Sequence, residues 1–166
     1  MTKSHIKFIH LVVHFWLTIY NIIHSFIDTI PGSQGTILYG AKILVTLLDI
    51  SANSGHGKVI YKNDPLIIDS IGTEMTAVRH GNGRDWWILI QRRNTNCFFR
   101  VLIDRAGPHL MADLTCVGTV MHQGQIGAAS FSPGGSKYCY LESSTGITLY
   151  DFDRCMGVLD NPKYLV

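Results

Sequence analysis

The stretch that decides the fold runs from Met75 to Gly107 and reads MTAVRHGNGRDWWILIQRRNTNCFFRVLIDRAG. It predicts three short strands, at 75–80, 86–91 and 97–103. The intervening segments, Gly81–Asp85 and Arg92–Asn96, are rich in glycine, asparagine and aspartate. These residue types tolerate the positive φ angles that tight hairpin turns need. We therefore expect an antiparallel three-stranded unit.

A second copy of this unit follows in Ala129–Gly157, which reads ASFSPGGSKYCYLESSTGITLYDFDRCMG. Gly83 and Gly135 are 52 residues apart, and Gly107 and Gly157 are 50 apart. A repeat of about 40 to 50 residues with about four strands is typical of β-propeller blades.

The strand expected at 42–50 resembles the third strand of a preceding blade. We therefore predict an all-β chain in which residues 36–166 form a partial β-propeller of about two and a half blades. Closed propellers typically have about four to eight blades, so a partial one leaves sheet faces open. The chain is then a fragment of a longer propeller, an open stack, or a unit that self-associates through its open blade faces or is completed by partner chains.

Residues 1–30 differ from the rest and read MTKSHIKFIHLVVHFWLTIYNIIHSFIDTI. Six polar residues in this stretch are spaced by four, four, three, four and three: His10, His14, Thr18, Asn21, Ser25 and Asp28. This spacing places them on one face of a helix, so we predict an N-terminal apolar helix that ends before Pro31. Secretory signal, membrane anchor through residues 8–27, and helix packed on protein remain open alternatives.

The predicted helix pairs His10 with His14 at metal-ligand spacing, but no HExxH glutamate accompanies them. A polar stripe without a metal is the favoured interpretation. Four cysteines, Cys97, Cys116, Cys139 and Cys155, form no CxxC pair and give no zinc signature. They are either disulfide-bonded in one of three pairings or buried as small apolar side chains.

The chain has 46% hydrophobic and 16% charged residues, and its formal net charge is +2. This charge is too small to indicate a nucleic-acid partner. The sequence has no GxSxG, no GxxxxGK[ST] and no helix-opening GxGxxG. We therefore predict no catalytic residue, no metal and no cofactor.

Four residues in or beside one turn could bind an anion or take part in acid–base chemistry: His80, Arg84, Asp85 and Trp87. The favoured alternative is structural, with Asp85 capping the turn and Arg84 paired to a neighbour. The remaining turn positions are expected to be purely structural: Asn82, Gly83, Pro133, Gly135, Asp151 and Asp153. Asp151 and Asp153 could contribute to a calcium site, but the twelve-residue ligand pattern of a calcium loop is missing.

Four blocks in order, LLDISANSGHGKVIYKND, MTAVRHGNGRDWWILIQ, IGAASFSPGGSKY and LYDFDRCMGVLDNP, lie within residues 44–162. Through them the chain resembles a family of exported Bacteroidetes β-propellers with WD-like repeats, often found with type IX secretion or gliding-motility sorting domains. Met156 stands where that family usually has Thr, and Gly134 where Asp is common. The resemblance implies a propeller fold and export or a cell-surface location, and it brings no catalytic residues.

The predicted function is a noncatalytic interaction module of an exported bacterial protein, with a protein or glycan partner. The alternative is a propeller hydrolase or lyase whose active site needs blades that this chain does not contain.

Overall fold

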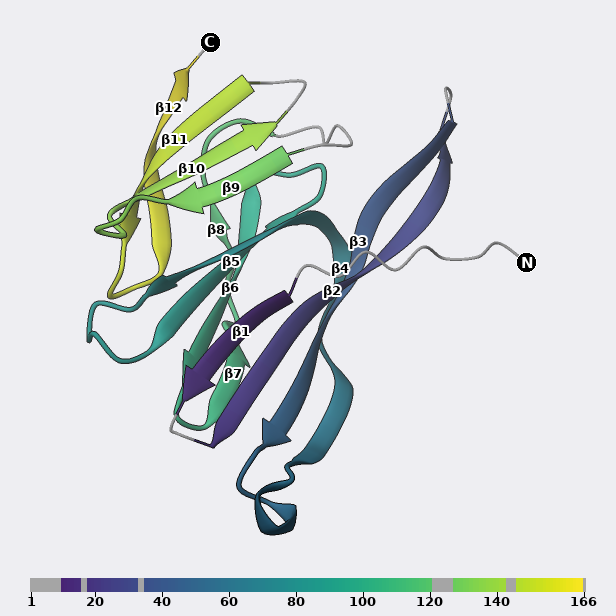
Figure 1. Ribbon diagram of the computed structural model, residues 1–166. Helices are drawn as coiled ribbons and strands as arrows, with labels where there is room; N and C mark the ends of the chain where they lie inside the picture. Colours follow the sequence, from purple (N-terminus) through teal and green to yellow (C-terminus); the bar gives the residue numbers. More distant parts are fainter. Residues whose placement is uncertain (1–9, 16–17, 33–34, 121–126, 143–145, 166) are drawn as a thin grey trace.

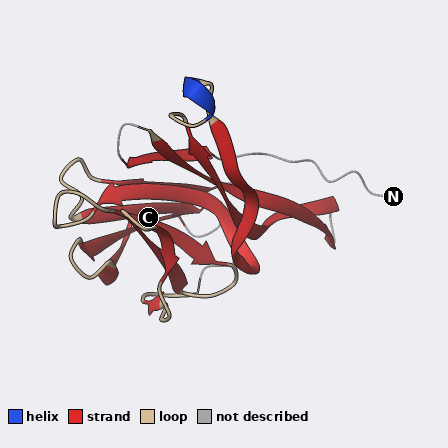
Figure 2. Ribbon diagram, turned by 90° about the horizontal axis from the view of Figure 1, so that it is seen from below, coloured by secondary structure: helices blue, strands red, loops and turns tan. Residues whose placement is uncertain are grey.

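A computed structural model describes residues 10–15, 18–32, 35–120, 127–142 and 146–165 (Figure 1). Strands make up most of it, and one short 3-10 helix, η1, follows β3 (Figure 2). The elements are β1 (His10–Phe15), β2 (Ile19–Gly32), β3 (Gly35–Asp49), η1 (Asn53–Gly55), β4 (Lys58–Arg79), β5 (Trp86–Arg92), β6 (Cys97–Asp104), β7 (Gly107–Leu110), β8 (Thr115–Cys116), β9 (Gly127–Phe131), β10 (Lys137–Glu142), β11 (Gly146–Asp153) and β12 (Val158–Leu165). The predicted all-β class is confirmed.

The strands form two antiparallel sheets that pack on one another (Figure 1). The first sheet has the order β1-β2-β3-β4-β5-β6-β7, with β8 paired to β6. The second has the order β12-β11-β10-β9. Every strand except β8 pairs with a strand next to it in the chain, because short hairpin turns favour antiparallel meanders.

The first sheet is continuous and curled, and it is not divided into the separate blades that the repeat predicted. The 22-residue strand β4 pairs with β3 through its first part and with β5 through its second. Register shifts along both pairings bend β4, as bulges do. The chain from β1 to β8 therefore forms one sheet, and the division into two and a half separate blades is not supported.

The predicted N-terminal helix is wrong over the residues that the structure describes. Residues 10–15 and 19–32 are the strands β1 and β2, and β2 pairs with β3 along its whole length. Of the 23 residues from 10 to 32, 13 are β-branched or aromatic, which favours strands. In this described part of the chain, no helix has the length and apolar character to cross a bilayer. Residues 1–9 of the predicted signal or anchor lie outside the described residues.

Two hydrophobic cores lie on opposite faces of β5. The first core, inside the curl of the first sheet, consists of Ile23, Ile43, Val45, Ile67, Ile71, Ile88, Ile90, Phe99, Val101 and Ile103. The second core, between the two sheets, consists of Val78, Trp87, Leu89, Phe98, Tyr138, Tyr140, Tyr150, Phe152 and Leu159. Successive side chains of a strand point to opposite faces, so the unbroken apolar run of β5 supplies both cores.

The second core is strongly aromatic. The ring of Phe98 meets those of Tyr138 and Tyr150 edge-on, at centroid distances of 5.9 and 5.8 Å. Such edge contacts are the favoured geometry of aromatic pairs. Burial raises the pKa of Tyr150 to about 12, so its hydroxyl stays neutral over the physiological range.

Candidate interaction site at the junction of three turns

Three turns from the two sheets meet at one place, which we call the turn junction: residues 80–85, 132–136 and 153–157. In the first turn, the side chain of Asn82 holds the backbone. Its Oδ1 accepts hydrogen bonds from the backbone N–H groups of Arg84 and Asp85, at 2.9 and 3.0 Å. Gly83 has a φ of +73°, which glycine adopts at little cost. The GNGRD sequence is therefore a self-capped turn.

Asp85 is buried and its carboxylate is held within the same turn. Arg84 donates from Nε to Oδ1 at 2.8 Å, and Asn82 donates from Nδ2 to Oδ2 at 2.6 Å. The hydrogen bond from Arg84 lowers the pKa of Asp85 below its ordinary value; burial opposes this, and Asn82 adds to it. The turn is capped by Asn82, whereas the sequence predicted Asp85 in that role.

His80 and Trp87 are also engaged by the protein itself. The Nδ1 atom of His80 accepts a hydrogen bond from the backbone N–H of Asn82 at 3.0 Å. Trp87 is 2% exposed and donates from its indole nitrogen to the carbonyl oxygen of Arg154 at 2.9 Å. The two rings stack at 5.5 Å. The structure thus brings the four predicted binding residues together, but their polar groups are directed at the turn and its neighbours.

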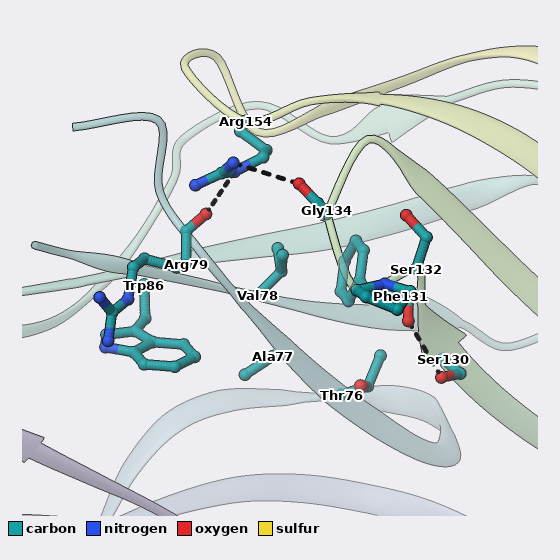
Figure 3. A pocket seen from close by; sticks show the side chains of 12 residues that line it. Thr76, Ala77, Val78, Arg79, Trp86, Ser130, Phe131, Ser132, Gly134 and Arg154 are labelled. Carbon is teal, nitrogen blue, oxygen red and sulfur yellow. Dashed lines mark hydrogen bonds between the residues drawn. The ribbon is translucent and has the colours of Figure 1, made fainter. Parts of the chain in front are cut away.

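Arg154 connects all three turns. Its guanidinium donates to the carbonyl oxygens of Arg79 at 2.8 Å and Gly134 at 3.1 Å (Figure 3). It also donates to the carbonyl oxygen of His80 at 3.2 Å. Its own carbonyl accepts from the backbone N–H of Gly81 and from Trp87. Arg154 was not among the residues predicted from the sequence. The available signal was its place beside Asp153 in a turn that the repeat aligns with the end of the first unit.

The other predicted turn residues have distinct places. Pro133 and Gly135 lie in the β9–β10 turn, where the N–H of Gly135 bonds the carbonyl of Ser132 at 2.8 Å. Asp153 fixes the β11–β12 turn, since its Oδ1 accepts from the N–H groups of Cys155 and Met156 at 2.7 and 3.1 Å.

Asp151 lies within strand β11 and not in a turn. Its carboxylate pairs with Lys137 and accepts from Asn161 Nδ2 at 3.0 Å. The hydrogen bond from Lys137 is the main cause that lowers the pKa of Asp151. Its contacts connect three neighbouring strands on the solvent side of the second sheet.

A groove of about 490 Å³ opens beside the turn junction, between β4 and β9 (Figure 3). Its walls come from residues 76–79, from Trp86, from residues 130–135 and from Arg154. The guanidinium of Arg79 lies over the ring of Trp86, with its carbon 5.2 Å from the ring centroid. Among the described residues that line the groove, none is acidic. Its lining therefore favours a ligand with a negatively charged group.

Two of the four cysteines are bonded. Cys97 of β6 and Cys116 of β8 are direct partners in the sheet and form a disulfide. Cys139 and Cys155 are free thiols. In the described ranges, no three His, Cys, Asp or Glu side chains gather in a way that could hold a metal ion.

Comparison with known proteins shows little similarity. The chain matches no protein-family model, and no curated protein matches it. A crystal structure of a functionally unknown protein from Desulfotomaculum acetoxidans DSM 771 is similar at 11% sequence identity and a TM-score of 0.27. That similarity covers 96% of this chain and 79% of the other. A TM-score this low supports no conclusion about fold or function.

Proposed function

We propose that this chain is a noncatalytic interaction module of an exported or cell-surface bacterial protein. The groove beside the turn junction carries the proposal. It is open, it is lined by two arginines and no acidic residue among the described ones, and it lies where three turns meet. Binding sites are commonly built on turns that a rigid sheet positions.

The partner of the groove is a protein or glycan with a carboxylate. The guanidinium of Arg154 already donates hydrogen bonds to three carbonyl oxygens of the protein itself. Arg79 is exposed, and the contact found for its guanidinium in the described part of the chain is the ring of Trp86. A guanidinium held flat on an aromatic ring still presents its N–H donors to a carboxylate at its edge. Arg79 is thus the residue that we assign to recognition.

The disulfide is consistent with the exported location. Stable disulfides form in oxidising compartments and are rare in the cytosol. Cys97 and Cys116 join two strands of the first sheet, so the bond fits a protein that folds outside the cytosol.

The test uses defined probes and the fluorescence of Trp86, which lines the groove. A Glu-rich peptide and an oligogalacturonate are compared with a Gln-rich peptide and a neutral oligosaccharide. We expect the acidic probes to bind and added salt to weaken them. Arg79→Ala should weaken binding about tenfold or more. Arg92→Ala is the matched control, because Arg92 is equally a strand-end arginine but pairs with Asp69.

Equal binding of acidic and neutral probes, or an Arg79→Ala variant that binds as well as the wild type, would overturn the proposed groove. Mass spectrometry of the same mixtures tests the alternative of a hydrolase or lyase. Cleaved probe would favour the enzyme, and intact probe would favour the interaction module.

A further inference from the structure

We infer that a cavity at one end of the curled first sheet is a binding site for a small apolar molecule that carries a hydroxyl or amide N–H group. The cavity has a volume of about 300 Å³, and its walls come from β2, β3, β4 and the turn between β6 and β7. It shares no lining residue with the groove beside the turn junction. The inference therefore does not depend on the proposed function.

The strand register directs one face of β2, β3 and β4 into this cavity. Asn21 pairs with Leu47, and Leu47 pairs with Tyr61. Ile19 lies two residues before Asn21, and all four residues line the cavity. Paired residues, and residues two apart in a strand, share a face of the sheet. The same face continues at Ile23 into the first core, so the cavity is an open end of that core.

The β6–β7 turn forms the opposite wall, because the curl of the sheet brings this turn back to β2 (Figure 1). Arg105, Ala106 and Gly107 line the cavity from this side. Arg105 and Ala106 are exposed, whereas Asn21 is only 2% exposed. The cavity thus has its mouth at the turn and Asn21 at its inner end.

Asn21 brings an unsatisfied hydrogen-bond acceptor to the inner end. Its Oδ1 is buried and accepts no hydrogen bond from the part of the chain that the structure describes. A buried polar atom without a partner costs its full desolvation penalty, and nearly all such atoms in native proteins have a partner. A ligand that donates a hydrogen bond to Oδ1 removes this cost when it binds. The ligand is therefore a hydrogen-bond donor.

The other side chains of the sheet wall favour an apolar body for the ligand. Ile19 and Leu47 are partly buried aliphatic residues, and Tyr61 adds an aromatic ring. Burial is the main cause that raises the pKa of Tyr61, so its hydroxyl stays neutral. Small-molecule sites of about 300 to 1,000 Å³ are typically apolar, with a few polar groups that fix orientation. A single-ring phenol matches this combination of size, apolar wall and one acceptor.

The first test titrates the isotope-labelled chain with three probes of similar shape and follows its amide signals by nuclear magnetic resonance. Para-cresol can donate a hydrogen bond, para-methylanisole can only accept one, and para-xylene can do neither. We expect para-cresol to shift the signals of Asn21, Ala106 and Gly107. The signals of Arg79 and Gly134, in the groove, should not move.

The second test measures the hydrogen bond itself. Asn21→Leu keeps the size of the side chain and removes the acceptor. In this variant the affinity for para-cresol, relative to the affinity for para-xylene, should fall about tenfold. The relative affinity for para-methylanisole should stay the same. Asn21→Leu should also raise the melting temperature by about 2 to 4 °C, because the unsatisfied acceptor is gone.

A third test closes the mouth of the cavity and does not depend on the folding of a buried variant. Ala106→Trp places a large ring at the exposed turn and should abolish the binding of all three probes. Ala112→Trp is the matched control, because Ala112 is also an exposed alanine but does not line the cavity. It should bind the probes as the wild type does.

Three outcomes would overturn the inference: no shift of the cavity signals with millimolar para-cresol, a relative affinity that Asn21→Leu leaves unchanged, or equal binding by Ala106→Trp and Ala112→Trp. Failure of the acidic probes to bind the groove changes none of these measurements, so the two proposals fail separately.

Discussion

At the scale of single residues, glycines at the turns decide how closely the two sheets approach. Gly157 has a φ of +71°, and a Cβ built on it would lie 2.7 Å from the indole of Trp87. Gly83 has a similar φ of +73°, but a Cβ added there would meet nothing within 4 Å. Alanine substitutions at these two positions therefore separate the cost of backbone strain from the cost of steric overlap with a buried side chain.

We expect Gly83→Ala to lower the free energy of unfolding by about 1 kcal/mol, since only the left-handed backbone is strained. Gly157→Ala should cost about 2 to 4 kcal/mol, because the buried indole must also move. Gly134→Ala is the control, since its Cβ meets nothing within 4 Å and no positive φ is involved. Urea titration of the three variants measures the differences, and equal losses at 83 and 157 would contradict this account.

The lowered pKa of the Asp85 carboxylate predicts how the stability of the folded protein depends on pH. Its pKa in the folded protein is held below the ordinary value of 3.8, chiefly by the hydrogen bond from Arg84. A group whose pKa is lowered on folding contributes stability above its unfolded pKa and loses it as the pH falls through the folded value. We therefore expect Asp85 to add to the loss of stability that begins as the pH drops below about 4.

Thermal melts of Asp85→Asn from neutral to strongly acidic pH test this. The variant should melt below the wild type at neutral pH, and the gap should narrow as the pH falls below about 4. In an Arg84→Met background, Asp85→Asn should lower the melting temperature at neutral pH by less, because Arg84 is the main cause of the lowered pKa of Asp85. A gap that stays constant with pH would show that Asp85 acts only through packing.

At the scale of elements, β5 shows what the sequence can predict. Its boundaries and its two apolar faces follow from the WWILIQ run and the glycine-rich turn before it. Both are local signals, and the structure has the strand at Trp86–Arg92. The turn at 80–85 follows from local signals for the same reason, because it is stabilised by hydrogen bonds within itself.

The N-terminal strands and the extent of the first sheet depend on pairing between strands, and the local sequence pattern does not show which strands pair. Six polar residues at helical spacing predict a helix, but β2 obtains its backbone hydrogen bonds from β3, whose residues begin after the apparent break at Pro31. Residues 62 and 63 form a bulge inside β4, where Asn63 has a φ of +58° and its N–H donates to the hydroxyl of Thr46.

The disulfide stabilises an element that has little else to hold it. Strand β8 has two residues, and Cys97–Cys116 bonds it to β6 across a sequence separation of 19. Closing a loop of this size is expected to contribute about 3 kcal/mol. We expect Cys97→Ser with Cys116→Ser to lower the free energy of unfolding by about that amount and to speed amide exchange in residues 107–120.

The matched control for the disulfide is Cys139→Ser with Cys155→Ser, which removes two free thiols and leaves the bond intact. This variant should keep the stability and the exchange pattern of the wild type. If reduction of the wild type changes neither its melting temperature nor exchange in 107–120, the bond contributes nothing to this element.

At the scale of the whole molecule, the two cores share the strand β5. Ile88 and Ile90 belong to the first core, and Trp87 and Leu89 to the second. All four are at most 2% exposed. Because one strand supplies both cores, loss of either core exposes apolar surface of the other, and the two sheets are expected to unfold together.

Arg154 tests how far the turn junction adds to this coupling. Its guanidinium reaches carbonyl oxygens of both sheets: Arg79 ends β4, His80 follows it, and Gly134 precedes β10. Hydrogen bonds from a charged donor contribute about 1.5 to 3 kcal/mol each and do not simply add. We expect Arg154→Met to lower the free energy of unfolding by about 2 to 4 kcal/mol and to speed amide exchange in β9–β12 more than in β2–β3.

The matched variant is Arg84→Met, which removes an arginine of the same junction whose side chain is 66% exposed and pairs within its own turn. It should leave the exchange of β9–β12 unchanged, since surface ion pairs contribute little to the packing of distant elements. If Arg154→Met speeds exchange equally in β2–β3 and β9–β12, the junction serves global stability only. If it changes neither, the second core alone holds the two sheets together, and the three turns merely lie beside one another.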